Sequence, residues 1–261
     1  MHTELISFAA TAPGAAGAAA VALSGDSLTI KNSRGEAQIL AWWADHQADG
    51  FQQLVFPSGH DTTRGFRSRV EVGEVSNLMT LGIPIDVQPQ EQMTVTMSGS
   101  AVAGDVESGC FLVNYRDLPG MSQRSITWDQ LRSRTEKLTT LDGTINTTPG
   151  PSYSGSQAIN AGSDLLLANR DYAIMGSRVT TQCLTLNVRG PDTGNVRVGM
   201  PGDVLHPEIT SNWFCLLSRA YDEPLIPIFN SGNKTSTLLD CAQDENAAAV
   251  PFTLFLALLK K

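Results

Sequence analysis

Charged side chains are scarce in this 261-residue chain, and basic side chains are the scarcer kind. Only 17% of the residues are charged, and 26 Asp and Glu outnumber 18 Lys and Arg, which gives a net charge of −8. Phosphate binding depends on clustered Lys and Arg. The nearest approach to a basic run, Arg64, Arg67 and Arg69, is followed at once by Glu71 and Glu74. The sequence therefore predicts no direct contact with nucleic acid.

Metal-binding and nucleotide-binding patterns are also missing. There is no CxxC motif, and no His stands beside a Cys at the spacing of zinc ligands. The chain has no Walker A sequence, no GxGxxG and no GxSxG elbow. We therefore predict no metal and no cofactor. We expect four buried, reduced cysteines, namely Cys110, Cys183, Cys215 and Cys241.

Long hydrophobic runs are absent as well. The most apolar stretch, residues 250–259, is about half as long as the roughly 20 residues that a membrane-spanning helix needs. An Ala-rich stretch, residues 11–23, follows a start that has no Lys or Arg, so it does not resemble a secretory signal. We therefore expect a soluble protein without a signal peptide or a transmembrane helix.

Short strand-like runs fill most of the sequence. Residues 93–98 (MTVTMS) and 183–188 (CLTLNV) alternate with period two, which predicts one face toward a core and one toward solvent. The 41% of hydrophobic residues suffices for a core, and 23 Gly and 13 Pro separate the runs. These features predict an all-β sandwich or barrel.

One segment, residues 125–143 (SITWDQLRSRTEKLTTLDG), favours a helix. Thr127 and Gln130 have the spacing of a capping box, and Ile126 and Leu131 have that of a hydrophobic staple. Leu138 would share a face with Leu131, and the glycine at the end of the segment would stop the helix. This predicted helix lies near the middle of the chain.

The triplet Ile-Pro-Ile occurs twice, at residues 83–85 and 226–228, and other features recur around it. Phe111 and Phe252 follow the two triplets at nearly equal distances, each near the start of an apolar run. Asp61 and Asp192 precede them in turn sequences, and residues 25–30 (GDSLTI) resemble residues 162–167 (GSDLLL). The repetition favours two tandem β-domains, residues 1–120 and 144–261, joined by a linker at 121–143. One large sandwich is the alternative.

Aromatic side chains are the main candidates for a site. Trp42 and Trp43 are neighbours in a predicted strand, so one should enter the core and the other should face outward. An outward Trp could stack on sugars, contact a subunit or simply close a barrel end. Tyr153 and Trp213 are further candidates for stacking or an interface.

Polar candidates are weaker. His60 and Asp61 could serve a hydrolase, but a turn held by an Asx-type hydrogen bond explains them as well. Residues 45–50 (DHQADG) hold Asp45, His46 and Asp49, which could form a metal cluster or a solvated turn. Two Asn-x-Thr triplets match the glycosylation pattern, and two acidic residues could serve a calcium site: Asn146 and Asn233, and Asp244 and Glu245.

The layout resembles that of the double-jelly-roll major capsid proteins of lipid-containing icosahedral bacteriophages. Two β-halves, the SITWDQLRSRTEKL segment between them, and the closing runs CFLVNY and PFTLFLALL carry this resemblance, which covers nearly the whole chain. It implies two tandem jelly-roll domains with a short linking helix. It also implies a homotrimer of pseudo-sixfold outline that tiles a shell over an internal membrane, and a place in the virion with other virion proteins after assembly in the host cytoplasm. No catalysis is implied, and no diagnostic motif transfers a role to any residue.

Two functions from other classes compete with this interpretation. A carbohydrate-binding β-sandwich or a phage tail receptor-binding protein would use Trp42, Trp43, Tyr153 or Trp213 as stacking platforms. A β-fold hydrolase would use His60 and Asp61.

Overall fold

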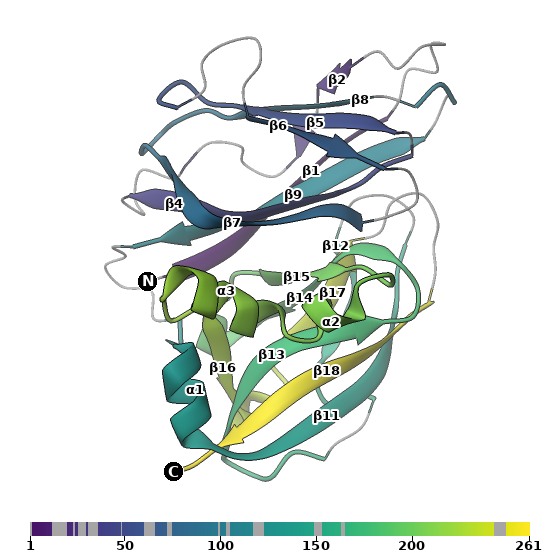
Figure 1. The fold of residues 1–261 in the computed structure, drawn as a ribbon. Coiled ribbons are helices and arrows are strands. Elements are labelled where there is room, and N and C mark those ends of the chain that lie inside the picture. Colours follow the sequence, from purple (N-terminus) through teal and green to yellow (C-terminus); the bar gives the residue numbers. More distant parts are fainter. Residues whose placement is uncertain are drawn as a thin grey trace.

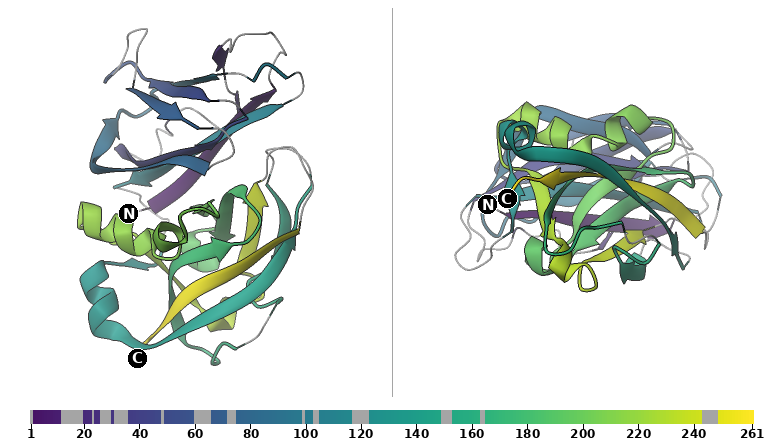
Figure 2. Two further views of the ribbon diagram at one scale, coloured as in Figure 1. Left: turned by 45° about the vertical axis from the view of Figure 1, so that its right-hand side comes forward. Right: turned by 90° about the horizontal axis from the view of Figure 1, so that it is seen from below.

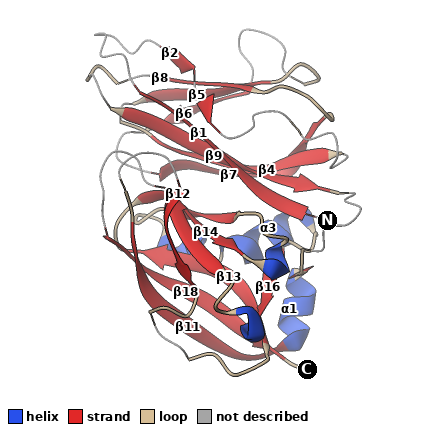
Figure 3. Ribbon diagram, turned by 180° about the vertical axis from the view of Figure 1, so that it is seen from behind, coloured by secondary structure: helices blue, strands red, loops and turns tan. Residues whose placement is uncertain are grey.

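A computed structural model describes most of the chain, and strands dominate it (Figure 3). The described residues are 2–11, 20–22, 24–25, 30, 36–47, 49–59, 66–71, 75–98, 100–102, 105–116, 123–148, 153–162, 165–242 and 249–261.

The first half of the chain forms two antiparallel sheets. Their strand orders are β3-β1-β9-β4-β7 and β2-β8-β5-β6. The strands are β1 (His2–Thr11), β2 (Ala20–Ala22), β3 (Ser24–Gly25), β4 (Ala37–Asp45), β5 (Gly50–Val55), β6 (Phe66–Val70), β7 (Val75–Val87), β8 (Thr94–Ser98) and β9 (Val106–Tyr115).

The second half forms two further sheets, of orders β10-β16-β13-β18-β11 and β12-β17-β14-β15. Its strands are β10 (Ser125–Ile126), β11 (Thr135–Asn146), β12 (Tyr153–Ala158), β13 (Asp171–Val179), β14 (Cys183–Arg189), β15 (Val198–Gly202), β16 (Ile226–Asn230), β17 (Leu238–Ala242) and β18 (Ala249–Leu259). Its helices are α1 (Trp128–Arg134), α2 (Pro207–Thr210) and α3 (Trp213–Tyr221), with 3-10 turns η2 (Pro191–Thr193) and η3 (Ser231–Asn233).

The two halves share one strand order. The series β1-β9-β4-β7 in the first half corresponds to β11-β18-β13-β16 in the second, and β2-β8-β5-β6 corresponds to β12-β17-β14-β15. Apart from the short additional strands β3 and β10, each half is therefore an eight-stranded jelly roll, and the predicted all-β, tandem jelly-roll fold is confirmed. The Ile-Pro-Ile triplets fall on the equivalent strands β7 and β16, and Phe111 and Phe252 fall on β9 and β18. Asp61 and most of residues 25–30 lie outside the described residues.

The two triplets have different local environments. In β7, pairing with β4 jumps from Ile85 to Thr80, so residues 81–84 bulge from this edge strand. Gly82 supplies the left-handed backbone at φ 59°, and Ile83 is 80% exposed. In β16 the pairing with β13 ends at Ile228. Pro227, which has no N–H, lies beyond this point and therefore removes no hydrogen bond from the pairing with β13. Both prolines thus occupy positions that a ladder tolerates.

The predicted helix at 125–143 is too long. Thr127 caps α1 with the expected capping box, and Ile126 and Leu131 are both buried in one core, but the helix ends at Arg134. The next twelve residues form β11, whose many β-branched residues suit a strand. Leu138 therefore lies on a strand and is 62% exposed, instead of sharing a helical face with Leu131.

Two helices were not predicted from the sequence. The short helix α2 begins with Pro207, and α3 follows it with Trp213, Phe214 and Leu217 buried. From the sequence, the residues around Cys215 were expected only to bury that thiol. The amphipathic spacing of these side chains, with Pro207 at a helix start, was the available signal.

The four sheets lie in layers (Figures 1 and 2). Below the two sheets of the first half come β14, β15 and β17 with α3 beside them, and β13, β18 and β11 form the far layer.

The two alternating runs of the sequence differ in burial. The prediction that residues 183–188 turn one face to solvent is wrong, because all six residues are buried. On β8, by contrast, Thr94 is exposed while Val95 and Met97 are buried, as predicted.

Candidate functional site

The surface between the two halves, called the seam below, is where the sheet that contains β4 meets β14, β15 and α3. One core cluster spans it, and includes Leu5, Leu40, Trp43 and Leu112 from the first half together with the core of the second half. A second cluster lies wholly inside the first jelly roll. The two halves are therefore joined by apolar packing like that of a domain interior.

Trp42 and Trp43 occupy different cores. Trp42 is 1% exposed and belongs to the cluster inside the first jelly roll, whereas Trp43 is 0% exposed and belongs to the seam. The pairing of β4 shifts between Ile39 and Ala41, and this irregularity decides which ring enters which core. The prediction that the two rings face opposite sides is confirmed. The prediction that one of them faces outward is wrong, because the second half covers it.

Trp43 is held by specific contacts in the seam. Its Nε1–H donates to the carbonyl oxygen of Leu184 at 2.8 Å. Its ring meets Trp213 edge-on, with centroids 5.4 Å apart and planes at 82°. Trp213 is itself 0% exposed. None of the three tryptophan rings can therefore stack on a sugar in solution.

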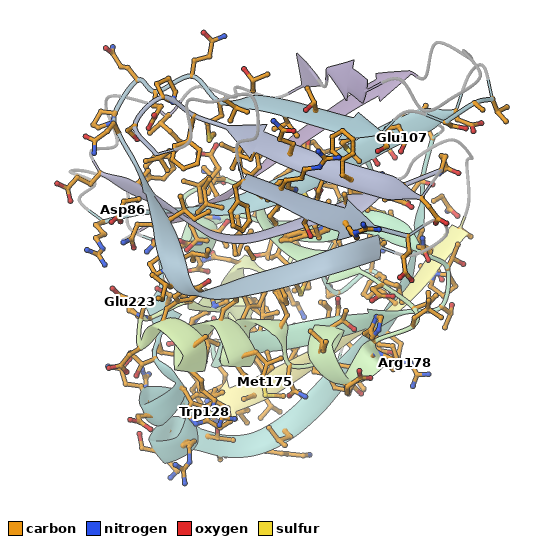
Figure 4. All side chains as sticks on the ribbon, turned by 45° about the horizontal axis from the view of Figure 1, so that its top comes forward. Asp86, Glu107, Trp128, Met175, Arg178 and Glu223 are labelled. Carbon is orange, nitrogen blue, oxygen red and sulfur yellow. The ribbon has the colours of Figure 1, made fainter. Side chains whose placement is uncertain are left out.

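Polar contacts add to the seam. The backbone N–H of Leu5 donates to the carbonyl oxygen of Arg197 at 3.0 Å, and the hydroxyl of Tyr221 donates to that of Leu40. Arg116 and Glu223 form an ion pair at 3.8 Å, with Glu223 at the boundary of the two halves (Figure 4). These contacts give partners to the N–H of Leu5 and to the carbonyl groups of Arg197 and Leu40 at the seam.

A buried carboxylate organises the nearby face of β14, β15 and β17. Asp240 is 1% exposed and accepts hydrogen bonds from Asn187 at 3.1 Å, Arg189 at 3.0 Å and Arg197 at 3.1 Å. The guanidinium of Arg197 lies 3.9 Å from the ring centroid of Tyr153. Tyr153, the fourth predicted stacking residue, is therefore half-buried and already carries a cation on its ring.

Another group of charged side chains in the second half surrounds Arg124. Arg124 donates to both carboxylate oxygens of Asp171, at 3.1 and 2.6 Å, and to Asp192 at 3.2 Å. Burial alone would raise the pKa of Asp171, but hydrogen bonds from Arg124 and Asn230 outweigh it and hold the pKa below its ordinary value. The hydrogen bond from Arg124 to Asp171 also raises the pKa of the guanidinium. This charge network fixes β13, β16 and η2 to one another.

Neither of the two alternatives for residues 45–50, a metal cluster or a solvated turn, describes Asp45 and His46, although Asp49 is exposed. Asp45 and His46 are buried: Asp45 accepts a hydrogen bond from Gln182 at 3.3 Å, and His46 lies 3.3 Å from the buried Glu107. Across the described ranges, no three His, Cys, Asp or Glu side chains come together as metal ligands would. His60, Asp61, Asp244 and Glu245 lie outside the described residues.

The two glycosylation triplets differ in their surroundings. The amide of Asn233 donates to Asp192 at 2.9 Å, so it is engaged within the fold. Asn146 is exposed at the end of β11. Because the amide of Asn233 already serves this contact, the triplet is best explained as a structural turn.

An open groove of about 450 Å³ lies over the β5–β6 hairpin. Gly50, Phe51, Arg67, Ser68 and Arg69 line it, and the Arg67 guanidinium lies 3.6 Å from the Phe51 ring centroid. Arg67 and Arg69 are exposed. This hairpin therefore places two cations on the outer sheet of the first half, far from the seam (Figure 1).

All four cysteines are buried with free thiols, as expected from the sequence. Burial raises the pKa of the Cys110 thiol well above its ordinary value, and raises that of Cys215 to about 12 against a weaker opposing effect of Arg219. These thiols are therefore poor nucleophiles in the folded protein.

The raised thiol pKa values predict a loss of stability in alkali. A folded pKa above the unfolded value of about 8.5 adds stability that is complete below that pH and declines as the pH rises toward 12. We expect the urea midpoint to fall between pH 8.5 and 10.5, and to fall less in Cys215→Ala. An identical decline in the variant and the parent protein would contradict this assignment.

Comparisons with known proteins were made for the whole sequence. No protein-family model and no curated protein sequence matches it. A solved structure that resembles it is the "Crystal Structure of the STIV MCP", the major capsid protein of an archaeal virus. The similarity covers 98% of this chain and 96% of that chain, at 10% identity and a TM-score of 0.20. A TM-score this low carries no conclusion about fold or function.

Within the parts of the chain that the structure describes, no helix has both the length and the apolar character needed to cross a bilayer.

Proposed function

We propose that the chain is a viral structural protein, a major capsid protein that assembles as homotrimers into an icosahedral shell. The repetition of one jelly roll within the chain carries this proposal. A trimer would contain six similar barrels and would have a nearly sixfold outline, which suits tiling. The proposed partners are the chain itself, neighbouring trimers, other virion proteins and an internal membrane, in the virion of a bacteriophage.

The seam supports a role as a rigid building block. A shell subunit must hold a fixed shape through many repeated contacts, and the shared core of the two halves resists hinge motion. Jelly rolls recur in capsid and lectin domains, and burying edges limits unwanted strand pairing. Such a role needs surface complementarity and requires no catalysis.

The competing functions lose their main residues. A carbohydrate-binding protein would need exposed aromatic platforms, but Trp42, Trp43 and Trp213 are buried and Tyr153 lies against Arg197. The residues proposed for a hydrolase, His60 and Asp61, lie outside the described part of the chain. No specific observation favours either function.

The mass of the purified protein tests the proposal. Light scattering coupled to size-exclusion chromatography should give three times the chain mass of 27.9 kDa or a larger assembly. Electron microscopy of that species should show particles with a six-sided outline. A protein that stays monomeric over the micromolar range, and binds immobilised glycans, would contradict it.

A further inference from the structure

Basic side chains from three separate segments meet at one corner of the second half. Leu259 of β18 pairs with Thr135 of β11, and the N–H of Lys260 donates to the carbonyl oxygen of Arg134 at 2.7 Å. This places the end of β18 beside the end of α1. The corner holds three of the five lysines of the chain, together with arginines: Arg132, Arg134, Lys137, Arg170, Lys260 and Lys261.

The charge of this corner opposes that of the whole protein. The net charge of the chain is −8, and the acidic groups on α1 and β11 are Asp129, in the first turn of α1, Glu136, which is paired with Arg170, and Asp142, which accepts a hydrogen bond from Thr253 further along β11. Asp171, beside Arg170, is held by Arg124. Lys137, Lys260 and Lys261 are all exposed. The corner is therefore a local basic surface on an acidic protein.

Exposed leucines adjoin the basic side chains. Leu138, Leu165 and Leu167 are 62%, 68% and 53% exposed, whereas Leu166 between the last two is buried. Among the described residues, they make up half of the six large apolar side chains that are exposed.

Residues on both sides of Leu165 and Leu167 contact β11, the strand that carries Leu138. On one side, a Cβ added to Gly162 would lie 2.2 Å from the carbonyl oxygen of Asp142 in β11. On the other side, Arg170 pairs with Glu136 near the start of β11. Gly162 and Arg170, on either side of Leu165 and Leu167, therefore both lie beside β11, the strand that carries Leu138.

We propose that this surface, the basic corner with its three leucines, binds the face of an anionic phospholipid bilayer. Lysine and arginine are attracted to anionic headgroups, and leucines beside them can enter the boundary between headgroups and acyl chains. The corner lies at the end of the second half that is remote from the first (Figure 2). The inference rests on the proposed function, and identifies the surface through which the shell protein would meet a membrane.

Lipid fits this surface better than a protein or a nucleic acid does. Lysine is depleted in protein–protein interfaces, yet three of the six basic residues of the corner are lysines. Nucleic acid would be held by the basic groups alone and would leave the exposed leucines without a role. A bilayer accounts for both kinds of side chain.

Vesicle flotation of the full chain tests the proposal, with phosphatidylcholine vesicles that contain or lack phosphatidylglycerol. The protein should float with the anionic vesicles alone. The variant K137Q/K260Q/K261Q should bind about 100-fold more weakly, since each basic residue contributes roughly fivefold. The variant L138S/L165S/L167S should also bind at least about tenfold more weakly.

Matched variants control for charge and for apolar surface. R67Q/R69Q/R178Q removes three positive charges elsewhere, with Arg178 well away from Trp128 of α1 (Figure 4). I83S/V102S/L205S removes the other three exposed apolar side chains. Both should bind vesicles like the parent protein.

Each other outcome overturns the proposal. Equal binding to neutral vesicles, or equal losses in the control variants, would remove the role of the corner. A short DNA duplex that binds the corner while vesicles do not would make it a nucleic-acid surface. Loss of the oligomer in K137Q/K260Q/K261Q would make it a subunit contact. Because the mass is measured separately, a monomer that still floats would contradict only the proposed capsid function.

Discussion

Replacing Trp43 with alanine is expected to lower the free energy of unfolding by about 4 kcal/mol and to loosen the seam. Buried Trp-to-Ala changes typically cost 3 to 5 kcal/mol, because they remove apolar contacts and leave a cavity. The change also removes the hydrogen bond to Leu184 and the edge-on contact with Trp213. Urea unfolding measures the loss, and hydrogen exchange locates it.

Trp42→Ala is the matched control for this experiment. The two residues are adjacent and equally buried, but Trp42 packs only inside the first jelly roll. Both variants should lose a similar amount of stability. Only Trp43→Ala should speed hydrogen exchange in β14 of the second half, where Leu184 lies. If both variants speed exchange in β14 equally, Trp43 has no special role in joining the halves.

Asp240→Ala is expected to destabilise the protein by about 3 kcal/mol. The carboxylate is 1% exposed and is the shared partner of Arg189, Arg197 and Asn187, so its removal leaves an unpaired buried amide and two uncompensated cations. The two arginines are about one-third exposed, so water offsets part of the cost. Chemical denaturation at neutral pH measures the change.

Asp171→Ala provides the comparison for Asp240. Its carboxylate also pairs with an arginine, but it is 25% exposed and Arg124 retains Asp192 as a second partner. We expect a loss of about 1 kcal/mol. A loss at Asp171 as large as that at Asp240 would show that burial does not set the strength of these pairs.

Local patterns predicted much of the fold. The alternation at residues 93–98, the capping box at Thr127 and Gln130, and the recurrence of Ile-Pro-Ile each had a counterpart in the structure. These features depend on neighbours in the chain, or on the repetition of a whole unit. They can therefore be recognised without knowing which surfaces meet.

The errors concern surfaces that meet only in three dimensions. Alternation placed Trp42 and Trp43 on opposite faces, but could not show that the second half covers the outer face. Likewise, β14 alternates like a half-exposed strand although both of its faces are buried. The helix prediction failed after Arg134 because pairing with β18 favours a strand over the local helical signals.

The candidate membrane surface could not have been predicted from the sequence. Its charges come from α1 and the adjoining start of β11, from Arg170, and from the end of β18, which lies more than 120 residues further along the chain than α1. Pairing between β11 and β18 brings them together. The leucines of segment 162–170 join them only because both ends of that segment contact β11.

The seam also has a consequence for synthesis of the protein. All strands of the first jelly roll precede residue 116, so this half can fold while the ribosome is still making the second. Until then its sheet β3-β1-β9-β4-β7 would present Leu5, Leu40, Trp43 and Leu112, which the second half later covers, to water. The second half cannot cover them in its final form before β18, which lies between β11 and β13, has been made. A half-made chain is therefore the form most prone to aggregate, and slow or paused translation should lower the yield of soluble protein.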